Sequence, residues 1–101
     1  MITINKTGAS LSVRGHAAGR DVKPTAETMQ ACAAVTAVVQ TTLFGIIELC
    51  NDHPNYVLSK GCFVLELSGL SEKSMLLVDT FLLGVSRMAE AYPDCIDLVQ
   101  A

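Results

Sequence analysis

The chain has 101 residues, of which 50% are hydrophobic and 17% are charged, and its formal net charge is −3. This composition is apolar enough to exclude a disordered chain, and the length suits one domain with one core. A net acidic chain without a basic run also lacks the charges that would neutralise nucleic-acid phosphates. We therefore expect a single domain over residues 1–101 that does not bind nucleic acid.

Signals for targeting and for metal binding are weak. Residues 1–6 lack the apolar core of a signal peptide, and we expect the longest apolar helix to fall short of a membrane-spanning length. The four cysteines are scattered, without a Cys-x-x-Cys pair: Cys32, Cys50, Cys62 and Cys95. Cys50 and His53 are three residues apart but have no third ligand nearby, so we assign them no role. These features predict a cytoplasmic protein with reduced thiols and with no metal, cofactor or membrane partner.

Alternating apolar residues predict two strands at the start of the chain. Residues 1–6 and 9–14 each alternate apolar and polar side chains, which is typical of a strand with one buried face. The short connection between them contains Gly8, and this arrangement favours an antiparallel hairpin. Gly15 ends the second strand, and residues 16–23 form a polar loop.

Two apolar stripes at three- and four-residue spacing predict two helices. The first helix runs to about Leu49, with Thr25 or Thr28 as its N-cap. The second is capped by Ser71, runs to about Ala91 and is terminated before the final strand. The stripes consist of Val35, Val39, Leu43, Ile46 and Cys50 in the first helix, and of Met75, Val78, Leu82, Val85 and Ala89 in the second.

The remaining segments predict further strands. Residues 56–58 and 62–67 form either one long strand or a tight hairpin around Lys60-Gly61. Residues 95–99 form a short last strand, with Ile96 and Leu98 facing inward. The order strand, strand, helix, strand, helix, strand predicts an α+β two-layer sandwich, in which two helices pack on a small, mostly antiparallel sheet.

A histidine and a cysteine at the ends of these elements point to chemistry. His16 follows the second strand, and Cys32 lies near the start of the first helix; an imidazole and a helix N-terminus both favour a thiolate nucleophile. Each residue also has a simpler interpretation, because a lone helical cysteine is usually buried and a histidine after a strand is usually a surface residue. Gly15 either permits an unusual backbone angle or lets an extended substrate approach His16 closely.

The residues around this pair resemble a known family. Gly15-His16-Ala17, followed by Cys32-Ala33-Ala34-Val35-Thr36-Ala37, resembles the bacterial ribosomal-processing cysteine protease family, often called Prp. The similarity spans nearly the whole chain and also includes Gln40-Thr41, Gly45, Leu83-Gly84 and Ala91-Tyr92-Pro93. The resemblance implies a small homodimeric cysteine endopeptidase that removes a short N-terminal extension from a ribosomal protein precursor of the large subunit.

Site roles follow from the same resemblance. It implies that Cys32 is the nucleophile and His16 the general base, with backbone amides at the helix start as oxyanion donors. We expect Gly15 and Thr36 to bind the substrate, whose extension would lie along Gly15 and residues 16–24.

Phe81 and Leu82 lie on neighbouring faces of the second helix, and we expect one chain not to cover both, which favours a homodimer.

The chain also departs from the family pattern. Met29 stands where members carry an aspartate, three residues before the cysteine, and the preceding loop is about four residues longer. Asp21 or Glu27 could supply the missing acid, although a solvated loop charge is the simpler interpretation of both. Thr36 replaces the usual serine. The alternative function is therefore a non-catalytic or retargeted member, including a phage-borne one, that acts as a dimeric peptide-binding or assembly module; a thiol-redox or metal protein is a weaker third class.

Overall fold

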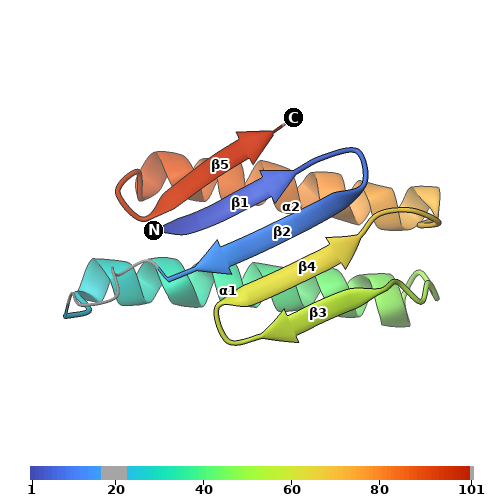
Figure 1. Cartoon of the computed structure of the whole chain (residues 1–101), viewed down its shortest axis with the longest axis horizontal. Coiled ribbons are helices and arrows are strands. Elements are labelled where there is room, and N and C mark those ends of the chain that lie inside the picture. The colour runs from blue at the N-terminus through green and yellow to red at the C-terminus, as the bar shows by residue number, and fades with distance from the viewer. Residues whose placement is uncertain (17–22, 101) are drawn as a thin grey trace.

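The computed structural model describes residues 1–16 and 23–100, and these form a five-stranded sheet with two helices on one of its faces (Figure 1). The elements are β1 (Ile2–Lys6), β2 (Ser10–Gly15), α1 (Ala26–Glu48), β3 (Tyr56–Ser59), β4 (Cys62–Glu66), α2 (Glu72–Ala91) and β5 (Ile96–Gln100). The α+β two-layer fold expected from the sequence is confirmed.

The strand order across the sheet is β3-β4-β2-β1-β5, and every neighbouring pair is antiparallel except β1 and β5. Strand alternation and register together place one row of apolar side chains on the face that the helices cover. Ile4, for example, lies opposite Val13 of β2 and Leu98 of β5, while Val13 lies opposite Phe63 of β4. The sheet therefore has one apolar face and one face open to solvent.

Residues 56–67, for which the sequence allowed one long strand or a tight hairpin, form the hairpin. β3 and β4 pair antiparallel, with Ser59 opposite Cys62 and Lys60-Gly61 forming the turn. The predicted order of elements counted this segment as one strand, so the observed order has one strand more. Gly61 has a φ of +74°, in the left-handed region that glycine adopts without strain.

Thr25 is the N-cap of α1, as one of the two predicted alternatives had it. The Thr25 side chain accepts a hydrogen bond from the backbone amide of Thr28, and the Thr28 hydroxyl accepts one from the Thr25 amide at 2.8 Å. Together these bonds satisfy orphan donors of the first turn.

The helix that follows ends at Glu48, next to the predicted Leu49, but its length and hydropathy were underestimated as a possible membrane span. In the described part of the chain, α1 is the one helix long and apolar enough to cross a membrane, a test that core helices of soluble proteins also pass. The prediction that it would fall short of a spanning length was therefore wrong. One side of α1 packs on the sheet through Val35, Val39, Leu43 and Ile46.

Ser71 is the N-cap of α2, as predicted, and a single carboxylate reinforces this cap. Asp52, in the loop after α1, accepts hydrogen bonds from the Ser71 amide at 2.9 Å and from the Ser71 hydroxyl at 2.8 Å. The buried Ser74 hydroxyl donates to the same oxygen of Asp52. These bonds tie the loop after α1 to the start of α2 and lower the pKa of Asp52.

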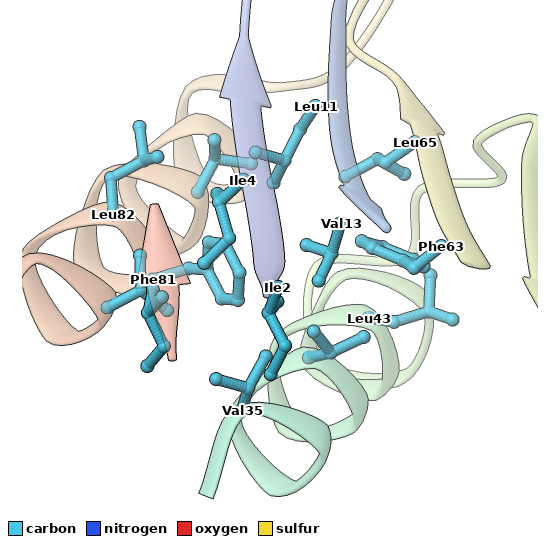
Figure 2. Packing of buried hydrophobic residues seen from close by; sticks show 14 of the residues in the cluster. Ile2, Ile4, Leu11, Val13, Val35, Leu43, Phe63, Leu65, Phe81 and Leu82 are labelled. Carbon is cyan, nitrogen blue, oxygen red and sulfur yellow. The ribbon is translucent and has the colours of Figure 1, made fainter. Parts of the chain in front are cut away.

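The core fills the space between the sheet and the helices (Figure 2). Phe81 and Leu82 are both buried within the single chain, at 1% and 8% exposure, so the expectation that one chain would leave one of them uncovered was wrong. The reason is that α2 contacts both the sheet and α1, which widens its buried face beyond one stripe.

Candidate active site

A cavity of about 350 Å³ lies between α1 and the ends of β2 and β4. The four site residues predicted from the sequence all line it: Gly15, His16, Cys32 and Thr36. Its other walls come from the sheet, from the β3–β4 turn and from α1: Ile2, Val13, Val35, Val39, Gln40, Leu58, Ser59, Lys60, Gly61, Cys62 and Phe63. Residues far apart in the sequence thus form one partly apolar pocket with a thiol and an imidazole at its edge.

Cys32 is partly buried and is the seventh residue of α1. It therefore lies in the second turn, where each backbone amide is bonded to the carbonyl four residues earlier. The expectation that amides at the helix start serve as oxyanion donors beside Cys32 was wrong, because α1 begins at Ala26. The field of the helix N-terminus likewise weakens beyond the first turn.

His16 directly follows β2, and its backbone is held on two sides. Its carbonyl accepts a hydrogen bond from the Met1 amino group at 2.5 Å, and the preceding Gly15 amide donates to the Gly61 carbonyl at 2.9 Å. The side chain is exposed and lies against the β3–β4 turn at Gly61. The imidazole thus sits at the mouth of the cavity that Cys32 lines.

The backbone conformation at position 15 and its close approach to Met1 require a glycine there. Its φ is +97°, and a Cβ added at this position would lie 2.5 Å from the Met1 carbonyl oxygen. The first of its two sequence interpretations, an unusual backbone angle, therefore describes it. Because Gly15 also lines the cavity, contact with a substrate stays a prediction.

Polar side chains follow Cys32 along α1 toward the rest of the cavity. Thr36 and Gln40 come four and eight residues after Cys32, so all three lie on the same side of the helix. Both Thr36 and Gln40 are exposed. Hydroxyl and amide groups at this spacing can hydrogen-bond the backbone of an extended peptide. Sequence reasoning used Gln40 only as part of the family resemblance, although its four-residue spacing from Thr36 signalled a shared side.

A second cysteine that borders the cavity escaped the sequence analysis. Cys62 begins β4 and is partly buried, and the Arg14 guanidinium donates to its sulfur at 3.7 Å. Arg14 and Cys62 are partners in the β2–β4 register, so the Cys62 thiol lies with Arg14 on the sheet face that the helices leave open, and the residue borders the cavity only at the start of β4. Only the hairpin and this register bring Cys62 to the cavity, and neither could be read from the spacing of the cysteines.

Acidic groups are missing from the described lining of the cavity. Glu27 is exposed in the first turn of α1, Met29 is 59% exposed, and Asp21 lies outside the described residues. Nor do any three His, Cys, Asp or Glu side chains of residues 1–16 and 23–100 gather as a metal site would require. The described chemistry of the cavity thus consists of the Cys32 thiol, one imidazole, and neutral or cationic polar groups.

The family model of the cysteine protease Prp matches residues 1–97. The chain belongs to the Prp family of cysteine proteases. This membership agrees with the resemblance seen in the Gly15-His16 and Cys32 segments, and it establishes that the chain is a member of a peptide-hydrolysing enzyme family. No curated protein sequence matches the chain.

Solved structures share this fold over at least nine-tenths of their length. A crystal structure of the S. aureus ribosomal processing protease Prp, with a covalently linked product peptide, has a TM-score of 0.81, 23% identity and full coverage of both chains. The same S. aureus protease with a substrate peptide has a TM-score of 0.78 and 18% identity, over 99% of this chain and 97% of that one. SMU.848 from Streptococcus mutans has a TM-score of 0.78 and 22% identity, over 98% and 90%.

Proposed function

We propose that this Prp family member is a cytoplasmic cysteine endopeptidase that removes a short N-terminal extension from a large-subunit ribosomal protein. Cys32 is the nucleophile and His16 the general base, within one domain over residues 1–101. The observation that carries this proposal is that both side chains line the same cavity, although sixteen residues separate them. The S. aureus member, which shares the fold, is a ribosomal processing protease and has been seen with bound peptides.

The proposed reaction has two stages. The His16 imidazole takes the proton of the Cys32 thiol, and the thiolate attacks the scissile carbonyl carbon to form a tetrahedral oxyanion. The oxyanion collapses to a thioester as the C–N bond breaks, and the imidazolium gives its proton to the leaving amine. Water, deprotonated by His16, then attacks the thioester, releasing the carboxylic acid and returning the proton to the Cys32 sulfur.

The walls of the cavity support a peptide substrate. Leu58 and Phe63, which lie opposite each other on β3 and β4, provide an apolar wall. Thr36 and Gln40 on α1 provide hydrogen-bonding groups along the other side. An extended peptide between these walls buries apolar side chains and keeps its backbone polar groups paired, as extended peptides require. Gly15, at the edge nearest His16, is where we expect the peptide backbone to pass.

The test is cleavage of a ribosomal protein precursor, followed by the mass of its N-terminal and C-terminal fragments. Cys32→Ala should abolish product formation, because no other group forms the thioester in the proposed reaction. Cys62→Ala is the matched control, since Cys62 also borders the cavity but its sulfur bonds Arg14 on the open face of the sheet, and we expect it to retain most of the activity. Cleavage that survives Cys32→Ala, or that disappears in Cys62→Ala alone, would contradict the assigned nucleophile.

One observation favours a second candidate, a peptide-binding module that does not cleave. No carboxylate of the described residues lines the cavity to orient His16, and Met29 stands exposed where members carry an aspartate. A non-catalytic module would bind the precursor with unchanged affinity in wild type and in Cys32→Ala, with no product from either protein.

The edge of the sheet supports the proposed homodimer. β3 is an edge strand, and three of its four residues are large, apolar and at least 41% exposed: Tyr56, Val57 and Leu58. An edge strand presents unpaired backbone amides and carbonyls, which make it a template for a further strand. We therefore propose that β3 pairs with a second copy of this chain.

A further inference from the structure

We infer that Gly61 is a positioning residue for His16, because the missing side chain at Gly61 leaves the space that the imidazole occupies. This inference rests on the proposed role of His16 as general base. It concerns a residue of the β3–β4 turn, 45 positions away in the sequence. Gly61 touches no reacting atom and would act only through the imidazole.

The geometry of the contact is close. A Cβ built on Gly61 would lie 2.8 Å from Nε2 of His16, 3.1 Å from Cε1 and 3.7 Å from Cδ2. Carbon and ring atoms in van der Waals contact are normally about 3.5–4.0 Å apart. The ring thus rests directly on the backbone of the turn, and any side chain at this position would displace it.

The backbone on both sides of this contact is fixed. The Gly15 amide, adjacent to His16, donates to the carbonyl of Gly61 itself at 2.9 Å. The neighbouring residues Arg14 and Cys62 are partners in the β2–β4 register. The turn and the chain at His16 therefore cannot separate without breaking sheet pairing. An added methyl group would instead rotate the imidazole away, and with it the base that serves Cys32.

The backbone conformation at position 61 also favours glycine. The experiment must therefore separate the effect of backbone strain from the effect of displacing the imidazole. Its φ of +74° would strain any substituted residue. Gly69 offers the matched control, because its φ is +79° and a Cβ added there would meet nothing within 4 Å. Alanine at either position therefore imposes the same kind of backbone strain, but only alanine at position 61 meets the imidazole.

The experiment compares Gly61→Ala with Gly69→Ala in thermal unfolding, in precursor cleavage and in the imidazole NMR signals. We expect both variants to lose similar stability. Gly61→Ala should lower kcat by roughly 10–100-fold with little change in KM, because the base is misplaced rather than the substrate. It should also shift the His16 ring signals and leave those of His53 in place. Gly69→Ala should keep both kcat and the His16 signals. Equal kcat in the two variants, or unmoved His16 signals in Gly61→Ala, would overturn the inference.

An asparagine substitution and a double variant provide further tests of whether Gly61 acts through His16. If Gly61→Ala does not fold, Gly61→Asn replaces it with Gly69→Asn as its control, since asparagine tolerates the left-handed region better. In a His16→Ala background, Gly61→Ala should cause no additional loss of activity, because no ring remains to be displaced. An additional loss would show that Gly61 acts by another route.

The signals of His16 also distinguish failure of this inference from failure of the proposed function. If His16→Ala cleaves the precursor normally while Gly61→Ala shifts the His16 signals, positioning stands and the general-base role fails. If His16→Ala is inactive and Gly61→Ala leaves the signals unmoved, the general-base role stands and positioning fails.

Discussion

Two cysteines, Cys32 and Cys62, border the same cavity as the imidazole of His16, yet the surroundings of their thiols differ. Cys32 projects from the second turn of α1, whereas the sulfur of Cys62 accepts a hydrogen bond from the Arg14 guanidinium at 3.7 Å. Cys32, Cys50 and Cys62 are all partly exposed, so reactivity toward an alkylating agent alone would not identify the nucleophile. Product formation in the single cysteine variants is the sharper criterion.

The four cysteines also differ in burial, and this gives a prediction about alkylation. Burial raises the pKa of the Cys95 thiol, the negative charges of Glu27 and Asp94 add to the effect, and the side chain is 3% exposed. Because the thiolate is the reactive species, Cys95 should react with iodoacetamide about tenfold or more slowly than the partly exposed Cys50. Peptide mass spectrometry of a time course near neutral pH measures both rates.

Unfolding provides the control for this prediction. In denaturant, Cys95 and Cys50 should be alkylated at similar rates, because burial is lost for both residues. Equal rates in the folded protein would contradict the burial of Cys95.

Among single residues, the sequence alone could predict the site residues whose side chains are themselves reactive. His16 and Cys32 could be proposed together because each is reactive and each lies near the end of an element. Cys62 and Gly61 could not be assigned to the site, since one looked like an ordinary strand cysteine and the other like an ordinary turn glycine. Their part in the cavity depends on the β2–β4 register and on the hairpin, which are contacts between distant segments.

Among the elements, helix boundaries were easier to predict than strands. Thr25 and Ser71 are the caps of α1 and α2 because a hydroxyl before an apolar stripe is a local signal. β3 lacks such a signal, since all four of its residues are exposed and no alternation marks a buried face. The six helical residues before Cys32 also mattered more than expected, because they remove Cys32 from the first turn.

The connection between α1 and α2 gives a prediction about acid stability. Hydrogen bonds from Ser74 and Ser71 lower the pKa of Asp52 below its usual 3.8. As the pH falls, the unfolded chain therefore takes up a proton at Asp52 before the folded protein does. The stabilisation is fully present above 3.8 and is lost as the pH falls through the lower folded pKa. Asp52→Asn should be less stable than wild type near neutral pH, and this difference should shrink in acid.

Urea unfolding of both proteins at about pH 7 and at about pH 3 measures this change. Glu66→Gln is a useful comparison, because hydrogen bonds from Ser68 and Asn55 lower the pKa of Glu66 while it contacts neither helix cap. We expect Asp52→Asn, and not Glu66→Gln, to weaken hydrogen-exchange protection at the start of α2. A difference between wild type and Asp52→Asn that stays constant with pH would contradict the role of the carboxylate.

For the molecule as a whole, the position of both helices on one face of the sheet decides which surfaces are left open (Figure 1). The uncovered face carries polar residues on its central strands, among them Thr3, Ser12 and Arg14. The edge strand β3 carries three exposed large apolar residues, whereas the opposite edge strand β5 carries one, Val99. An open polar face needs no partner, whereas an apolar edge strand is a site where a second copy could pair.

The dimer proposal predicts that a charge on this edge dissociates the protein. Val57, in β3, is 54% exposed and lies opposite Val64 of β4. Val57→Lys should produce a monomer, because lysine on an edge strand opposes pairing with another chain. Leu76→Lys is the matched control, since Leu76 is 66% exposed on α2, in a different element from the edge strand. Sedimentation velocity over a range of concentrations measures the mass of each protein. A monomeric wild type would contradict the homodimer, and dissociation by Leu76→Lys but not by Val57→Lys would place the interface on the helices instead of β3.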